Sequence, residues 1–196
     1  MSLYDRQETL KLDINHTVAV VGCGGIGFWV AKLLCMSGVK KFYLFDPDII
    51  EEHNLNRIDV PQRFVGMNKA EVTKTVMTIL RDDITVYTFP FPFESVGLDS
   101  SVNWLIDCTD KDKVQLKNQE IADTAGVKYF KAGYDGEEFG IHNRVAEWGE
   151  STEGYVITPS WSVPAVIIAS LAVAKVMKYP DKEVSSSVDR LFRIDR

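Results

Sequence analysis

The chain has 196 residues, the length of one large domain, and we expect a single domain over 1–196. Its 45% hydrophobic and 26% charged residues are ordinary for a globular protein and exclude a disordered or collagen-like chain. With 22 Lys and Arg against 28 Asp and Glu, the net charge is -6, which argues against nucleic acid or an anionic membrane as the main partner. A small phosphate site is still allowed, because it needs only a few local cations.

The cysteines and the N-terminal segment indicate the cellular compartment in which the protein is expected. Cys23, Cys35 and Cys108 form no C-x-x-C pair, so the sequence indicates neither a disulfide framework nor a zinc site. The first residues are polar and lack the apolar run of a signal peptide. The longest apolar stretch, 163–177, is shorter than the roughly 20 residues of a membrane span. We therefore expect a cytoplasmic protein without a membrane partner.

Segments with strand-like and helix-like patterns alternate along the first two thirds of the chain. The patterns predict strands at 17–21, 41–45, 84–88, 102–106 and 127–130, and helices at 26–37, 69–80 and 112–125. This order predicts an α/β fold, a Rossmann-like and mostly parallel sheet with helices on both faces.

The final third has a different pattern. Ile141–Trp148 alternates enough to be a strand, and we expect it to form a small antiparallel extension of the sheet. Residues 161–178 form a helix that is apolar almost all round. Such a helix is buried, either in the core of its own chain or at a contact between subunits. The sequence leaves both possibilities open.

The segment VVGCGGIG carries the strongest local signal. It places Gly22, Gly24, Gly25 and Gly27 between a strand and a helix, and Asp46 follows 19 residues after Gly27, at the end of the next strand. This arrangement is typical of nucleotide-binding folds: the glycines allow a phosphate to approach the helix N-terminus, and the aspartate accepts hydrogen bonds from ribose hydroxyls. The alternative is a glycine turn with a capping aspartate.

The connection after Asp46 is unusually long. About 20 residues precede the helix that starts near Lys69, whereas such connections usually have 2–6 residues. The connection contains Asp48, Asn54 and Arg57. Arg57 and Lys69 are the two types of cation that hold polyphosphates, and this disfavours a simple nicotinamide-dependent hydride transfer. A solvated loop with charges at the helix end is the alternative.

Two aspartates follow the strand at 102–106. Asp107 and Asp110 are expected to point into the same crevice as the glycine loop, because ligands of open α/β sheets bind at the carboxyl ends of the strands. A carboxylate at this position can hold Mg²⁺ together with substrate phosphates. Asp110 can equally cap the following helix.

Together these motifs resemble the ThiF/MoeB/HesA family, the bacterial relatives of ubiquitin-activating enzymes. The resemblance covers roughly 4–177, and its motifs are Tyr4-Asp-Arg6-Gln7, GCGGIG, Asp46-Pro-Asp48, Asn54-Leu-Asn-Arg57, Asn68-Lys69-Ala-Glu71 and Asp107-Cys-Thr-Asp110. It implies ATP-dependent adenylation of the C-terminal glycine of a small ubiquitin-like or sulfur-carrier protein of the thiamine or molybdopterin type. It also implies a homodimer.

The resemblance assigns roles to individual residues. Arg57 and Lys69 bind and stabilise the phosphates with help from Asn54, and Asp46 holds the ribose with Asp48 beside it. In addition, Asp110 binds Mg²⁺, and Arg6 reaches the phosphates from a partner subunit. All these residues are present in the sequence.

The chain departs from the family in three places. It lacks the zinc-binding C-x-x-C pairs, only GESTEG separates Trp148 from Tyr155 where relatives have a long crossover loop, and the stretch from Arg6 to Gly22 is short. The acceptor is therefore open: a carrier protein, a peptide carboxylate or a tRNA threonylcarbamoyl group. A Rossmann-type NAD-binding protein is a further alternative. We expect structural roles for the cysteines, and the three histidines have no metal-binding spacing.

Overall fold

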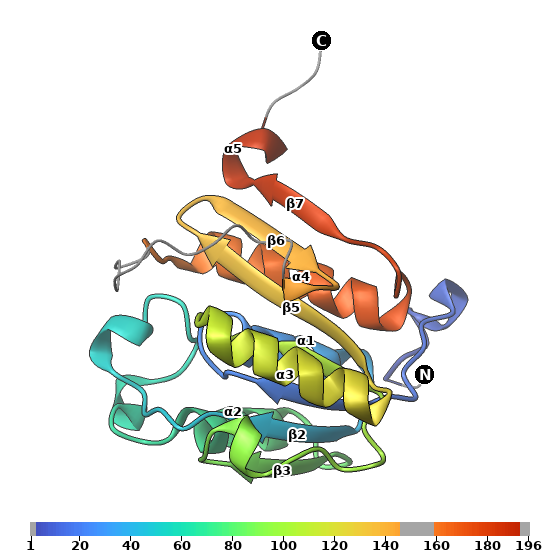
Figure 1. Cartoon of the computed structure of the whole chain (residues 1–196), viewed down its shortest axis with the longest axis horizontal. Coiled ribbons are helices and arrows are strands. Elements are labelled where there is room, and N and C mark those ends of the chain that lie inside the picture. The colour runs from blue at the N-terminus through green and yellow to red at the C-terminus, as the bar shows by residue number, and fades with distance from the viewer. Residues whose placement is uncertain (1–2, 146–158, 193–196) are drawn as a thin grey trace.

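The computed structural model describes residues 3–145 and 159–192. In the described part of the chain one sheet of seven strands has the order β3-β2-β1-β4-β5-β6-β7 (Figure 1). The strands are β1 (Thr17–Val21), β2 (Lys41–Phe45), β3 (Thr85–Phe89), β4 (Trp104–Asp107), β5 (Lys128–Asp135), β6 (Glu138–His142) and β7 (Val184–Ser187). The helices are α1 (Gly27–Ser37), α2 (Lys69–Leu80), α3 (Asp112–Ala125), α4 (Ser162–Met177) and α5 (Val188–Leu191).

Strands β1 to β5 are parallel to one another. Strand β6 pairs antiparallel with β5, and β7 pairs antiparallel with β6. The parallel strands β1, β2 and β4 are short runs rich in β-branched, aromatic and other apolar residues and are almost fully buried, as strands covered on both faces must be. The carboxyl ends of β1, β2 and β4 lie together, since Val21 pairs with Phe45 on one side and with Asp107 on the other. The Rossmann-like α/β fold predicted from the sequence is confirmed.

Helices cover both faces of the sheet (Figure 1). One core contains α1, α2 and α4 packed on side chains such as Phe42, Trp104 and Phe130. The other core lies under α3 and includes Tyr43, Phe45 and Leu105. This two-sided burial holds the strand ends, and the loops that follow them, in fixed positions.

The last part of the sheet differs from the prediction. The strand expected at Ile141–Trp148 begins earlier, at Glu138, and ends at His142, while Trp148 lies outside the described residues. The reason is a tight turn in which Gly136 adopts a φ of 58°, so that Asp135 pairs directly with Glu138. The residues around this turn are charged, so the hydrophobic pattern of the sequence does not indicate a hairpin there. Strand β7 and helix α5 were not predicted, because both are short and polar.

Helix α4 has two different faces. Its buried residues, among them Ile168, Ala172 and Val176, pack on α1, β5 and β6. Other apolar residues stay partly exposed, including Val163, Ile167 and Leu171. No helix among the described residues is long and apolar enough to cross a membrane.

Candidate nucleotide-binding site

The glycine loop joins β1 to α1, and two of its glycines are sterically required. Gly22 has a φ of 86°, and a Cβ there would lie 3.0 Å from the carbonyl oxygen of Cys108. A Cβ on Gly27 would lie 1.8 Å from the carbonyl oxygen of Gly22. At Gly24, in contrast, no heavy atom of the described residues lies within 4 Å of the position of a Cβ. The loop is therefore tight at both ends and open in the middle.

Asp46 holds this loop from the end of β2. Its Oδ2 accepts a hydrogen bond from the backbone N–H of Cys23 at 2.6 Å, and its Oδ1 accepts one from the N–H of Asp48 at 2.8 Å. The side chain is only 4% exposed, and burial raises the pKa of this carboxyl group, whereas the two N–H groups and Lys69 lower it. Each oxygen keeps a lone pair for a further donor, such as a ribose hydroxyl.

Arg57 lies directly against the loop. A Cβ on Gly25 would come within 2.9 Å of Arg57 Cδ, so the glycine makes room for the arginine side chain. Arg57 Nη1 donates to the carbonyl oxygen of His53 at 2.9 Å and to Asn56 Oδ1 at 3.0 Å. Trp29 of α1 donates its indole N–H to the carbonyl oxygen of Arg57 at 2.8 Å. The guanidinium is thus held beside the glycines, at the start of α1.

Lys69 lies at the start of α2, on the same edge of the sheet. Its Nζ is 3.1 Å from Asp48 Oδ2, and its charge lowers the pKa of the Asp46 carboxyl. The lysine side chain is 14% exposed and that of Asp48 is 68% exposed. This ammonium is paired with an exposed carboxylate, which it can exchange for a phosphate at low cost.

Asn54 has a structural role within the long connection. It is 3% exposed, its Oδ1 accepts from the backbone N–H of Glu51, and the two residues form a capping box around the short 3₁₀ helix Glu52–Asn54. The backbone N–H of Arg57 donates to the Asn54 carbonyl oxygen. The contact of Asn54 with phosphate therefore stays a prediction, whereas its control over the path of the loop is visible.

The two aspartates after β4 have different environments. Asp107 was expected to point into the crevice, but it is fully buried. It accepts hydrogen bonds from Thr109, Asn118 and Tyr129. Burial raises the pKa of its carboxyl group. Asp110, in contrast, is exposed beyond the strand end. It makes no cap, because the N-cap residue of α3 is Lys111, without a side-chain cap.

Arg6 is the one predicted site residue that lies elsewhere. Its segment contacts the far end of α1: Gln7 donates to the carbonyl oxygen of Ser37, and the Tyr4 ring lies against Gly38. An 11-residue helix is about 16 Å long, which separates Arg6 from the glycine loop of its own chain. Figure 1 shows the N-terminus on the opposite side from the connection between β2 and α2.

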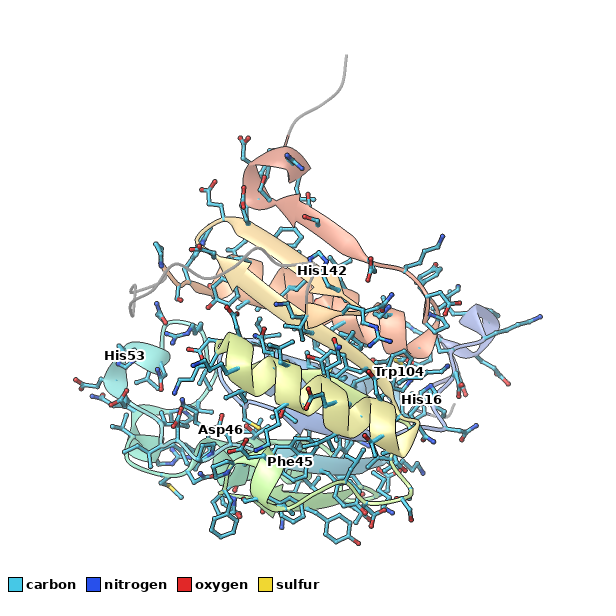
Figure 2. All side chains as sticks on the ribbon, in the orientation of Figure 1. His16, Phe45, Asp46, His53, Trp104 and His142 are labelled. Carbon is cyan, nitrogen blue, oxygen red and sulfur yellow. The ribbon has the colours of Figure 1, made fainter. Side chains whose placement is uncertain are left out.

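The cysteines and histidines form no second centre. Burial raises the pKa of all three thiols, which makes them poor nucleophiles. Among residues 3–145 and 159–192, no three metal-binding side chains come together. Figure 2 shows Asp46 and His53 at one end of the sheet, with His16 and Trp104 at the other. A surface hollow of about 400 Å³ at that other end is lined by His16, Asn103, Trp104 and Lys128 and is separate from the site.

The residues present fit a nucleoside triphosphate. The open position above Gly24, the free N–H groups at the start of α1 and the cations Arg57 and Lys69 together suit an anion. The exposed carboxylate of Asp110 also suits Mg²⁺, which commonly takes one or two carboxylates and completes its shell with phosphates and water.

Several residues that build the site received no role from the sequence, although Asn68 and Thr109 lie within the family motifs. Asn68 caps α2 through Oδ1, which accepts from Ala70 and Glu71, while its Nδ2 donates to the carbonyl oxygens of Asp46 and Asp48. An asparagine just before a helix, with glutamate three positions later, is a recognisable N-terminal signal. No sequence signal marks Trp29 as a partner of the site, and the motif that contains Thr109 does not indicate its contacts.

The fold and the site together define an α/β protein with a glycine loop and neighbouring cations that suit a nucleotide. The model of the ThiF family matches residues 2–195. The chain therefore belongs to the ThiF family, as its motifs predicted.

Relatives with curated names include ubiquitin-like modifier-activating enzyme 5 of Culex quinquefasciatus, 26% identical over 69% of this chain and 38% of the relative. Another is the adenylyltransferase and sulfurtransferase UBA4 of Saccharomyces cerevisiae (strain YJM789), 30% identical over 63% of this chain and 29% of the relative. The chain thus spans well under half the length of these proteins.

Among solved structures, E. coli MccB with ATP superimposes with a TM-score of 0.78 at 21% identity, covering 96% of this chain and 69% of that chain. MccB with AMPCPP and MccA superimposes with a TM-score of 0.77 at 22% identity, covering 93% and 62%. At this identity the likeness establishes the fold.

Proposed function

We propose that this chain is an ATP-dependent adenylyltransferase that activates a substrate carboxylate as an acyl adenylate. The observation that carries the proposal is the position of Arg57 and Lys69 at the open glycine loop, which Asp46 holds in place. A nicotinamide enzyme has no use for two cations there. Family membership and the solved MccB complex with ATP support the same nucleotide.

The reaction explains why the site has cations and no evident general base. An ionised carboxylate attacks the α-phosphorus, the bond between that phosphorus and the bridging oxygen breaks, and pyrophosphate leaves. The nucleophile has already lost its proton at pH 7, so the chain needs only to orient the reactants and stabilise negative charge. Arg57 and Lys69 supply that charge stabilisation, and Asp46 orients the ribose. Mg²⁺ bound at Asp110 would neutralise the departing pyrophosphate.

The C-terminal glycine of a small ubiquitin-like or sulfur-carrier protein is our first candidate acceptor. The names of the curated relatives, a ubiquitin-like modifier-activating enzyme and an adenylyltransferase, support it. A peptide carboxylate is the second candidate, supported by the likeness to MccB solved with MccA. Because all three thiols have raised pKa values, we propose that the acyl adenylate is not passed to a cysteine of this chain.

We also propose that the chain works as a homodimer. Helices α1 and α4 pack side by side and present apolar side chains that are at least partly exposed: Trp29, Leu33, Met36, Val163, Val166 and Ile167. Met36 is 51% exposed and Val163 37%. Partly exposed apolar side chains on two neighbouring helices favour contact with a second copy. Arg6, too distant from its own glycine loop, would then serve the partner's site.

Exchange of labelled pyrophosphate into ATP tests the proposal, with carriers that end in Gly-Gly and short peptides as separate acceptors. We expect exchange with one acceptor class and its loss, by more than 100-fold, in Lys69→Ala and Arg57→Ala. Arg63→Ala removes an exposed arginine of the same connection and should retain exchange. Tight ATP binding without exchange for any acceptor, or binding of NADH in preference to ATP, would contradict the proposal.

A further inference from the structure

Lys131 of β5 is a buried lysine that the proposed reaction does not use. It is 3% exposed and pairs in register with Asp107 of β4 and His142 of β6. Its ammonium donates a hydrogen bond to Gln115 Oε1 of α3 at 2.9 Å. Gln115 is also buried, at 7% exposure. Burial of a lysine and a glutamine costs free energy unless hydrogen bonds compensate for the lost hydration, so the partners of these two side chains matter.

The contacts continue from Gln115 to the segment that carries Asp110. Gln115 Nε2 donates to the carbonyl oxygen of Thr109. On its other side Thr109 donates twice to Asp107 Oδ1, from its N–H at 3.0 Å and from its hydroxyl at 2.7 Å. Cys108 in turn donates its N–H to Val21, at the start of the glycine loop. Thr109 is therefore held on both sides, directly before Asp110.

The charge of Lys131 decides how this chain of hydrogen bonds is oriented. An ammonium group can only donate, so the amide oxygen of Gln115 must face it, and the amide NH₂ must then face Thr109. Burial lowers the pKa of Lys131 to about 8, while the carboxylates of Asp112 and Asp107 act in the opposite direction. The protonated, donating form therefore predominates at pH 7.

We propose that Lys131 is a positioning residue that, through Gln115 and Thr109, fixes the carboxylate of Asp110 for the Mg²⁺ that accompanies ATP. This inference rests on the proposed function and names a residue that touches neither nucleotide nor metal. Partners that orient a metal ligand in this way commonly change metal affinity 10–100-fold when they are removed.

Three substitutions separate positioning from mere stability. Lys131→Met keeps the length of the side chain but cannot donate, so the Gln115 amide loses its fixed orientation. Gln115→Glu places a carboxylate against the ammonium and strengthens that contact, yet it has no NH₂ group for Thr109. Lys128→Met is the matched control, because Lys128 is exposed at the other end of the same strand.

The measurement is ATP affinity by calorimetry, with EDTA and with Mg²⁺, on proteins whose folding is checked by circular dichroism. We expect Mg²⁺ to strengthen ATP binding to the wild type. This gain should fall about tenfold in both Lys131→Met and Gln115→Glu, with affinity in EDTA changed less than about twofold. Lys128→Met should keep the full gain, and Lys131→Arg should restore most of it.

The outcomes distinguish this inference from the proposed function. A wild type that binds no ATP contradicts both. Binding of ATP with a Mg²⁺-dependent gain that survives in Gln115→Glu, or in a folded Lys131→Met, contradicts the positioning role alone. A wild type whose ATP affinity ignores Mg²⁺ also contradicts it, while leaving adenylation open to the exchange test.

Discussion

At the scale of single residues, three glycines of one loop have three different reasons to be glycine. Gly27 lets two parts of the backbone touch, Gly25 makes room for the Arg57 side chain, and Gly24 faces open space. The first is a requirement of folding, because backbone cannot move aside. The second is a weaker requirement, because the Arg57 side chain is flexible and can move aside. The third has no explanation within the described chain, and the nucleotide of the proposed function would supply one.

We expect Gly24→Ala to separate stability from nucleotide binding. A methyl group at this position meets no protein atom that the structure describes and is compatible with the backbone, so the melting temperature should stay within about 2 °C of the wild type. ATP affinity, measured by calorimetry, should fall at least roughly tenfold, because the methyl group occupies the space of a phosphate.

Gly27→Ala provides the contrast, since its methyl group would lie 1.8 Å from a carbonyl oxygen. We expect a protein that unfolds at a clearly lower temperature. Full ATP affinity in Gly24→Ala would contradict the placement of the phosphates at this loop.

At the scale of elements, the connection between β2 and α2 is an ordered part of the site. Asn68 joins its end to its beginning: Nδ2 donates to the carbonyl oxygens of Asp46 and Asp48, and Oδ1 caps α2. Ile49 forms an isolated bridge with Asn68, and the N–H of Lys69 donates to the Asp48 carbonyl oxygen. The position of Lys69 therefore depends on this closure.

Asn68→Ala should consequently affect both stability and binding. Loss of an N-cap costs about 1–2 kcal/mol of the free energy of unfolding, which urea denaturation measures. Asn68→Asp keeps the cap but loses the two donated hydrogen bonds, so both variants lose the link between the loop ends and ATP affinity should fall in both, whereas stability should fall mainly in Asn68→Ala. Equal ATP affinity in Asn68→Ala and the wild type would show that the link does not position Lys69.

At the scale of the whole molecule, the described chain carries a site at one end of the sheet and Arg6 at the other. Helix α1 runs from the glycine loop to the segment that carries Arg6, and both α1 and its neighbour α4 have partly exposed apolar residues. A second copy packed on these residues would bring the two ends together in a closed, two-fold arrangement. The sequence left open whether α4 is buried in the core of its own chain or between subunits. In the structure one face of α4 is buried in the core, and the other face stays partly exposed.

Mixing two inactive variants tests this arrangement. Arg6→Ala and Lys69→Ala should each lose pyrophosphate exchange, but after subunit exchange half of the dimers contain one intact site. The mixture should therefore regain about a quarter of the wild-type rate. A monomer in light scattering, or a mixture as inactive as its components, would contradict a partner-supplied Arg6.

Much of this protein was predictable from local patterns. The glycine loop, the flanking strand and helix, and Asp46 follow from short-range backbone requirements that leave a mark in the sequence. The role of Asp107 was predicted wrongly, because an aspartate at a strand end looks the same whether it faces solvent or α3. The hairpin at Gly136 was missed, because charged residues at a turn resemble a loop.

The sequence by itself determined the fold class, the family and the set of charged residues that we propose to bind phosphate, since each depends on motifs contiguous along the chain. Only the tertiary structure decided which carboxylate is buried, which glycine faces open space, and that Lys131 reaches Thr109 through Gln115. These features depend on packing between β4, β5 and α3, and contacts between segments distant in the chain leave no periodic signal. The tertiary structure also placed Arg6 away from its own glycine loop, which makes a second copy part of the proposed site.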